Sequence, residues 1–193
     1  MAGPERKQTI RTSAAEVFAD KGYDRASIRD VAKASEMSLA GLYYYFKGKE
    51  EILFDIQYEA FQTLLEQHAE ALAGVTEPIE KLDRIIMGHC RFFASHLHEM
   101  KVMSREAEQL EGKLDEDVGE LRRRYVRLVR GVMDEIAEEK KKRDVPIGTA
   151  VFLLFGMMNW MYTWYDRTRD GEPDDIARQV SKVFLHGFLS EPA

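Results

Sequence analysis

The sequence predicts an all-α protein of about nine helices, with an N-terminal three-helix head and a larger helical body. Apolar residues recur at spacings of three and four along almost the whole chain, which is the period of amphipathic helices. Sustained alternation of apolar and polar residues is missing, so strands are not predicted. Hydrophobic residues make up 45% and charged residues 32% of the chain, a globular profile. We expect domains at 1–48 and 49–193.

The N-terminal part predicts three helices. An apolar stripe extends the first helix as far as Gly22, which is a typical C-cap. The second helix spans 28–35, behind a capping box formed by Ser27 and Asp30. After a three-residue break, a third helix spans 38–46. The stripe of the first helix consists of Ile10, Ala14, Val17 and Phe18.

Six further helices are expected in the body. Their approximate ranges are 50–74, 78–98, 101–110, 112–142, 146–168 and a last helix after the turn at 170–173. The helix over 146–168 is long and apolar enough to suggest a membrane span. Asn159 near its middle, together with Thr149 and Thr163, favours a buried core or dimer helix instead.

The charge is unevenly distributed. The net charge is −6, yet residues 1–50 carry nine Lys/Arg against seven Asp/Glu, and residues 51–193 carry nineteen against twenty-seven. An acidic body behind a mildly basic head still allows the head to dock on nucleic acid. One cysteine, Cys90, cannot form an internal disulfide, and the N-terminus lacks the apolar core of a signal peptide. We therefore expect a cytoplasmic protein.

The stretch LAGLYYYFKGKEE carries the strongest functional signal. Two short helices around a three-residue break predict a helix-turn-helix, whose second helix enters the DNA major groove with its N-terminal residues leading. Leu42 and Phe46 lie four residues apart and should face the core, so Tyr43, Tyr44 and Tyr45 point outward or sideways, where tyrosine hydroxyls can donate to phosphates. Lys49 can hold a further phosphate. The leading residues are small or short: Ser38, Leu39, Ala40 and Gly41.

Residues 6–56 resemble the DNA-binding head of the TetR family of transcriptional regulators. The matching features include Gly22-Tyr23, the run from Ser27 to Ala32, and the run from Gly41 to Phe46. The resemblance implies a homodimer with two heads on one palindromic double-stranded operator and a ligand-binding body. Tyr45 stands where many members have histidine. The residues that the resemblance implies for DNA contact are Ser27, Arg29, Ser38, Ala40, Gly41, Tyr43, Tyr44 and Lys49.

The C-terminal part resembles members of that family that respond to acyl-CoA thioesters of fatty-acid or aromatic-acid degradation. The resemblance implies an apolar tunnel for the acyl chain and cations for the phosphates. The arginine-rich run over 122–130 and Arg167 with Arg169 could supply those cations, although such arginines are more often a solvated face. Candidate ligand-binding residues are Phe92, Phe93, Met103, Tyr125, Val129, Phe155, Asn159, Trp160 and Trp164. Apolar residues at helical spacing are equally typical of core.

The last two helices are expected to form the dimer interface, with Phe152, Phe184 and Phe188 as contacts. His89, Cys90, His96 and His98 could suggest a metal site, but their spacing is unlike that of structural zinc sites, and we expect no metal or other cofactor.

No motif for nucleophilic, phosphate-loop or metalloprotease chemistry is present, so we expect no enzyme and no membrane partner. Two alternatives stay open: a multidrug- or fatty-acid-sensing regulator of the same fold, and a helical small-molecule-binding protein without DNA activity.

Overall fold

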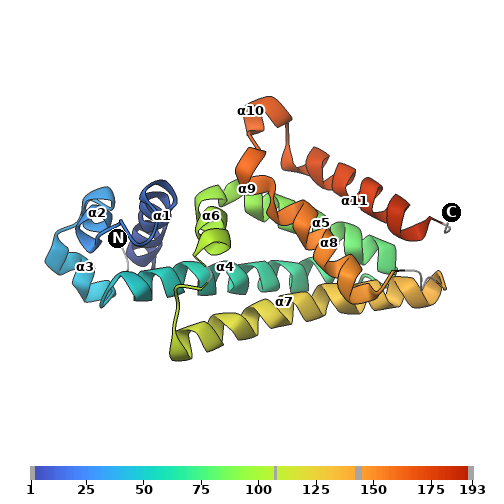
Figure 1. Cartoon of the computed structure of the whole chain (residues 1–193), viewed down its shortest axis with the longest axis horizontal. Coiled ribbons are helices and arrows are strands. Elements are labelled where there is room, and N and C mark those ends of the chain that lie inside the picture. Colours follow the sequence, from blue (N-terminus) through green and yellow to red (C-terminus); the bar gives the residue numbers. More distant parts are fainter. Residues whose placement is uncertain (1–2, 107, 142–144, 191–193) are drawn as a thin grey trace. The chain divides into compact units, whose positions relative to one another are not determined.

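The computed structural model describes residues 3–106, 108–141 and 145–190, and these form helices and connecting turns without any strand. The predicted all-α class is therefore confirmed (Figure 1). The helices are α1 Gly3–Lys21, α2 Ile28–Ala34, α3 Leu39–Tyr45, α4 Lys49–Leu72, α5 Pro78–Ser95, α6 Leu97–Arg105, α7 Gly112–Glu139, α8 Ile147–Asn159, α9 Met161–Trp164, α10 Arg167–Asp170 and α11 Pro173–Leu189.

The chain packs as two compact units. The first comprises residues 1–61 and 97–121, and the second comprises residues 62–96 and 122–193. By packing, the start of α4 and all of α6 thus belong with the N-terminal helices. The expected boundary at residues 48 and 49 concerns function, and it stays a prediction.

The short helix α2 is fixed by the capping box that the sequence predicts. The hydroxyl of Ser27 accepts from the backbone N–H of Asp30 at 3.2 Å, and the Asp30 carboxylate accepts from the backbone N–H of Ser27 at 2.9 Å. Lys21 also donates to Asp30 at 2.5 Å. These hydrogen bonds, the one from Lys21 first, hold the pKa of Asp30 well below its usual range. The capping box therefore satisfies two of the free N–H groups at the start of α2, those of Ser27 and Asp30.

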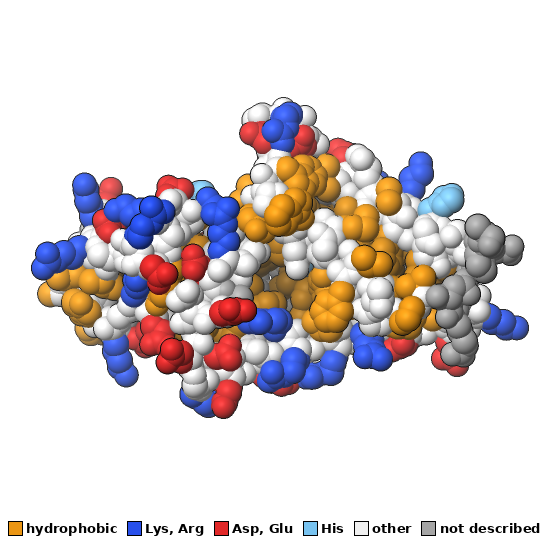
Figure 2. Space-filling model, viewed as in Figure 1, with side chains coloured by type: hydrophobic (Ala, Val, Ile, Leu, Met, Phe, Trp, Pro, Cys, Tyr) orange, Lys and Arg blue, Asp and Glu red, His pale blue; other side chains and the backbone are white. Residues whose placement is uncertain are grey.

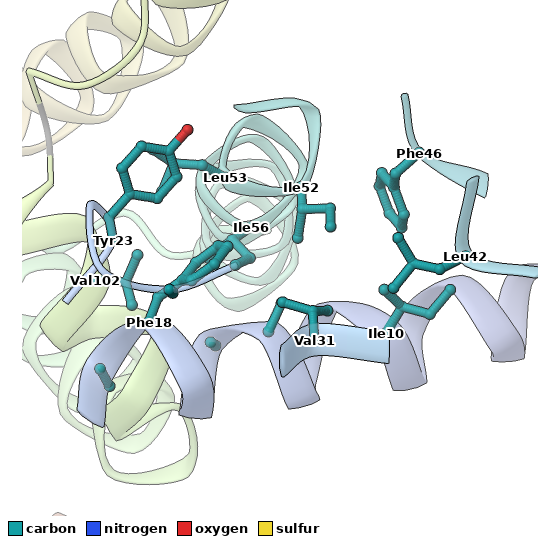
Figure 3. Close-up of a cluster of buried hydrophobic side chains, with 14 of the residues drawn as sticks. Ile10, Phe18, Tyr23, Val31, Leu42, Phe46, Ile52, Leu53, Ile56 and Val102 are labelled. Carbon is teal, nitrogen blue, oxygen red and sulfur yellow. The ribbon is translucent and has the colours of Figure 1, made fainter. Parts of the chain in front are cut away.

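A continuous apolar core holds the first unit together (Figure 3). Ile10, Leu42 and Phe46 meet at one end of this core, and Val102 of α6 joins Phe18 at the other. Its fully or almost fully buried members also include Ala14, Ala15, Val31, Ile52, Leu53, Ile56 and Val118. The helix-turn-helix is thus positioned by packing on α1 and the start of α4.

One polar cluster braces the same unit. The carboxylate of Asp55 on α4 is almost completely buried and pairs with Lys7 and with Arg11 of α1, the latter at 3.2 Å. Arg11 also lies 3.3 Å from Glu59. A buried carboxylate needs such partners, because ionised groups are costly to desolvate. The cluster fixes α1 against α4.

The expected single helix over 146–168 is wrong, because the chain turns twice within it. Tyr165 is extended, with ψ 128°, and Asp166 follows with φ −136°. The Asp166 carboxylate accepts from the backbone N–H groups of Thr168 at 2.8 Å and Arg169 at 3.3 Å. This side-chain cap competes with continuation of the helix. It therefore starts the short α10 instead.

The second unit is built around α5, which packs along α11 and also contacts α8 and α9. Arg91 of α5 and Asp174 of α11 form a two-pronged ion pair with N–O distances of 2.6 and 2.7 Å. Phe184 and Phe188 of α11 stack with ring centroids 5.8 Å apart. Both rings are only 8% exposed, so they contribute to the core of this unit.

Candidate DNA-binding head and effector site

The helix-turn-helix is made by α2, α3 and a tight turn. Glu36 in this turn has φ 53°, a left-handed conformation that is uncommon for residues other than glycine. The backbone N–H of Met37 then donates to the carbonyl of Ala32 at 2.9 Å, which ends α2. At the start of α3, the Ser38 hydroxyl accepts from the Gly41 N–H at 3.0 Å. A Cβ on Gly41 would lie 3.1 Å from that hydroxyl, so glycine suits this close approach.

The two sides of α3 differ as the sequence predicts. Leu42 and Phe46 are buried, whereas Tyr43 is 49% and Tyr44 83% exposed. Tyr45 is half-buried and meets the edge of the Tyr44 ring, with centroids 5.0 Å apart. On the face shown in Figure 2, hydrophobic side chains gather over α3 with Lys and Arg side chains nearby. The exposed rings and the small first turn are available to a partner.

Three of the remaining residues expected at DNA lie on the surface, because Ser27, Arg29 and Ala40 are all exposed. Lys49 has a role that sequence reasoning missed. Its ammonium donates to the backbone carbonyl of Tyr23 at 2.6 Å and lies 4.2 Å from the centre of the Tyr23 ring. Lys49 therefore fixes the start of α4 to the loop after α1, and this contact competes with any phosphate contact.

Aromatic rings gather around His89 in the second unit. His89 stacks on Phe93 with centroids 4.1 Å apart, and Tyr125 and Phe155 lie 5.8 and 6.2 Å from it. The Tyr125 hydroxyl and the His89 Nδ1 are 2.8 Å apart. The structure thus brings together Phe93, Tyr125 and Phe155 of the predicted ligand-binding set. We call these three rings with His89 the aromatic cluster.

The other predicted ligand-binding residues are not part of this cluster, although Asn159 interacts with the His89 side chain. Val129 and Phe92 are buried, and Phe92 stacks on His96 with centroids 4.2 Å apart. Asn159 and Trp160 are exposed at the end of α8, Trp164 is 40% exposed, and Met103 is half-buried on α6 in the first unit. Trp160 and Trp164 are therefore not lining residues of a buried tunnel in this structure.

A surface groove of about 630 Å³ runs between α4 and α7 within the second unit. Its lining residues are Gln62, Leu65, Glu66, Ala69, Arg124, Arg127 and Leu128. Two of the predicted cations are thus in a groove. Arg167 and Arg169 instead pair with Glu172 and Asp170 at 2.7 Å each, which makes them part of the turn around α10.

Sequence reasoning missed His68 of α4. This ring is almost completely buried, and its two nitrogens lie 2.6 Å from the carbonyl oxygen of Leu64 and 3.0 Å from that of Ile85. A Cβ on Gly88 would lie 3.3 Å from the ring, so glycine in the middle of α5 lets His68 approach closely. A glycine inside a strongly periodic helix is the sequence signal that could have indicated this contact.

The three predicted dimer contacts differ in how exposed they are. Phe152 is 66% exposed, and Leu153, Trp160 and Val183 are also exposed apolar residues on α8 and α11 or directly beside them. Hydrophobic side chains accordingly gather over α8 and α9 in Figure 2. Phe184 and Phe188 are each 8% exposed and stack on one another, and their place in a dimer interface stays a prediction.

The sequence also raised a membrane span and a metal site, and the described residues bear on both. Within them, no helix is both long and apolar enough to cross a membrane. The described His, Cys, Asp and Glu side chains also form no group of three or more that could hold a metal ion. His89 instead faces Tyr125, His96 lies 2.8 Å from the carbonyl of Phe92, and Cys90 is buried.

Fold and site together define a helix-turn-helix DNA-binding protein with a separate helical unit that encloses an aromatic cluster. Residues 10–56 match the family described as bacterial regulatory proteins of the tetR family, and residues 75–188 match the tetracyclin repressor-like C-terminal domain. The chain therefore belongs to the TetR family, and it is a transcriptional regulator with a helix-turn-helix DNA-binding domain.

Several known proteins are similar along nearly the whole chain. The fatty acid metabolism regulator protein of Bacillus subtilis is 26% identical and covers 96% of both chains. The crystal structure of PfmR from Thermus thermophilus superposes with a TM-score of 0.83 at 30% identity, over 95% of this chain and 96% of that one. AibR in complex with isovaleryl coenzyme A and operator DNA has a TM-score of 0.83 at 22% identity, over 96% and 100%. This last likeness shows the fold.

Proposed function

We propose that the protein binds a palindromic operator as a homodimer and that a small apolar effector releases it from the DNA. The effector that we favour is an acyl-CoA thioester. The observation that carries the DNA half is α3, where a first turn of small residues stands beside two exposed tyrosines, Tyr43 and Tyr44. In a dimer, the two copies of α3 would sit about 34–36 Å apart to enter successive major grooves.

The effector half is supported by the second unit and by the relatives. The aromatic cluster offers an apolar environment for an acyl chain, and Arg124 and Arg127 in the groove offer guanidinium groups suited to phosphate. The Bacillus subtilis relative is named for fatty acid metabolism, and AibR was crystallised with an acyl-CoA and operator DNA.

Helix α4 is the element through which we expect the effector to act, because its residues belong to both units. Effector binding would move α4 and change the spacing of the two heads. An effector shifts such an equilibrium only through its different affinity for the two states, and a coupling of about 1–3 kcal/mol, or about 5–150-fold in affinity, would be typical.

Dimerisation is supported by the exposed apolar residues of α8 and α11, since large exposed apolar patches are uncommon on monomers. Phe152→Glu should convert a dimer into monomer in native mass spectrometry. Tyr44→Glu, which alters an exposed ring of the first unit, is the matched control and should leave the dimer intact. A Phe152→Glu protein that remains fully dimeric would assign the interface to another surface.

The central experiment measures operator binding by fluorescence anisotropy, on DNA selected from a random pool by the purified protein. Acyl-CoA thioesters of increasing chain length are then added, with free coenzyme A as the control. We expect at least one thioester to weaken operator binding by fivefold or more. If the protein binds the selected DNA and no thioester changes this binding, the DNA-binding part of the proposal stands and acyl-CoA is excluded as the effector. Failure to select any DNA would overturn the proposal.

A further inference from the structure

The imidazole of His89 is an isolated polar group in an apolar environment. It lies in the middle of α5 and is 1% exposed. Its ring stacks on Phe93 at an interplanar angle of 22°, and the Tyr125 ring lies nearly parallel to it, at 13°, with centroids 5.8 Å apart. Phe155 packs against both His89 and Tyr125. Buried polar groups are normally hydrogen-bonded, so each of its two nitrogens needs a partner.

Only one nitrogen of His89 has such a partner among the described residues. Nδ1 lies 2.8 Å from the Tyr125 hydroxyl, whereas the buried Nε2 has no hydrogen bond. If Tyr125 donates its hydrogen to Nδ1, the ring hydrogen sits on Nε2, and a single buried group is left unmet. The opposite arrangement would leave two unmet groups, the phenol hydrogen and the Nε2 lone pair. We therefore assign the hydrogen to Nε2, which makes it an unused donor.

The neighbours of His89 do not supply the missing acceptor. Both nitrogens of His68 lie within hydrogen-bonding distance of the carbonyls of Leu64 and Ile85. Asn159, the exposed last residue of α8, interacts with the His89 side chain and raises its pKa. Even so, Nε2 has no hydrogen bond of normal geometry. Asn159 indicates the end of α8 as the side from which an acceptor could approach.

We propose that the Nε2 hydrogen of His89 donates to a neutral carbonyl oxygen of the effector, which for an acyl-CoA is the thioester carbonyl. This inference rests on the proposed function and narrows its ligand class, because it favours thioesters over free fatty acids. Tyr125 has a positioning role: its hydroxyl fixes the tautomer of His89 and so keeps the hydrogen on Nε2.

The charge state of the ring supports this choice of ligand. Burial, followed by the charge of neighbouring His68, lowers the pKa of His89 to about 3. The ring is therefore neutral near pH 7 and can donate a hydrogen without offering a positive charge. A carboxylate would lose its water in this apolar cluster without gaining a counter-charge from His89, whereas a thioester carbonyl loses much less.

The test compares ligands that differ in one carbonyl. The full-length protein is titrated by isothermal calorimetry with saturated acyl-CoA thioesters and with S-alkyl-CoA thioethers of the same chain length. We expect the wild-type protein to prefer the thioester by tenfold or more. His89→Phe should lose this preference while still binding the thioether, and His89→Gln, which keeps an N–H donor, should retain part of it. His96→Phe, at the residue that directly follows the same helix, is the matched control.

Each result is decisive. Equal binding of thioester and thioether by the wild-type protein would overturn this inference and leave the acyl-CoA proposal standing. Failure of every CoA derivative to bind would overturn both. A second measurement needs no ligand: the ¹⁵N shifts of the His89 ring report which nitrogen carries the hydrogen. A hydrogen on Nδ1 in the free protein would overturn the inference even if His89→Phe fails to fold.

Discussion

The first and second units bury their polar groups in opposite ways, and from here on they are called the head and the body. In the head, the buried carboxylate of Asp55 is paired with two cations, and Ser27 and Ser38 cap their helices. In the body, His89 keeps an unmet nitrogen inside an aromatic cluster. A unit whose described side chains leave no buried nitrogen or oxygen without a partner is suited to hold a fixed shape. A unit with one unsatisfied group is suited to change when something satisfies it.

The two units also differ in the chemistry of the apolar side chains that they expose. The head exposes Tyr43 and Tyr44, whose hydroxyls can meet phosphates, whereas helices α8 and α11 of the body expose Phe152, Leu153 and Val183, which have no polar atoms in their side chains. The first kind of surface fits a wet, polar partner such as DNA, and the second fits an apolar partner such as another protein surface. The comparison predicts that changes in one unit leave the function of the other largely intact.

The largest expected effect is the loss of the head core in Phe46→Ala. Phe46 is 1% exposed, and truncation of a buried phenylalanine typically costs about 3–5 kcal/mol. Operator binding should be abolished while effector binding persists, measured by anisotropy and calorimetry on one preparation. Tyr44→Ala, at an exposed ring of α3, should leave thermal stability unchanged. Simultaneous loss of effector binding in Phe46→Ala would mean that the two units unfold together.

Acidification should instead weaken the body. The pKa of His89 is about 3 in the folded chain and about 6.5 in an unfolded one. The unfolded chain therefore takes up a proton below pH 6.5 that the folded chain does not, and stability falls as the pH drops toward 3. The loss should reach about 2 kcal/mol between pH 7 and pH 5. Burial raises the pKa of Cys90 to about 12 and that of Tyr125 well above its usual value, so neither titrates in this range.

Urea denaturation at the two pH values measures this effect. The control is His89→Gln, which has no titrating group at this position and should show a pH dependence smaller by about the same 2 kcal/mol. An equal pH dependence in both proteins would show that His89 is protonated in the folded chain.

The head was predictable because its signals are local, and the body was not because its contacts join distant parts of the chain. The capping box of Ser27 lies within four residues, and Leu42 and Phe46 repeat at a helical period. The His89–Tyr125 contact joins residues 36 apart, and no sequence pattern announces it. The exposure of the apolar residues of α11 was unpredictable for a related reason. Val183 and Phe184 are adjacent and both apolar, and only tertiary packing leaves the valine exposed and buries the phenylalanine.

A smaller effect is expected at the DNA surface. If the Tyr43 hydroxyl holds a phosphate, Tyr43→Phe should cost roughly 1 kcal/mol, about fivefold, in each head, and so about 25-fold in the operator affinity of the dimer, with the same factor for unrelated sequences. Anisotropy with the operator and with single-base variants measures both. Effector affinity serves as the internal control and should not change. Weakening confined to one base position would make Tyr43 a base reader instead.

The smallest effect concerns the turn between α2 and α3. Glu36 has φ 53°, and a residue with a Cβ in this left-handed region costs roughly 1 kcal/mol of stability. Glycine removes this cost, but its greater conformational freedom in the unfolded chain offsets part of the gain. Glu36→Gly should therefore raise the melting temperature of the head slightly, with a gain of about 0.5 kcal/mol. Glu36→Ala keeps the Cβ and should bring no gain. Lys141 at φ 55° is the equivalent position in the body, and Lys141→Gly should stabilise only that unit. If both glycine variants raised the stability of both units equally, the head and the body would unfold as one cooperative structure, and the contrast between them would concern chemistry alone.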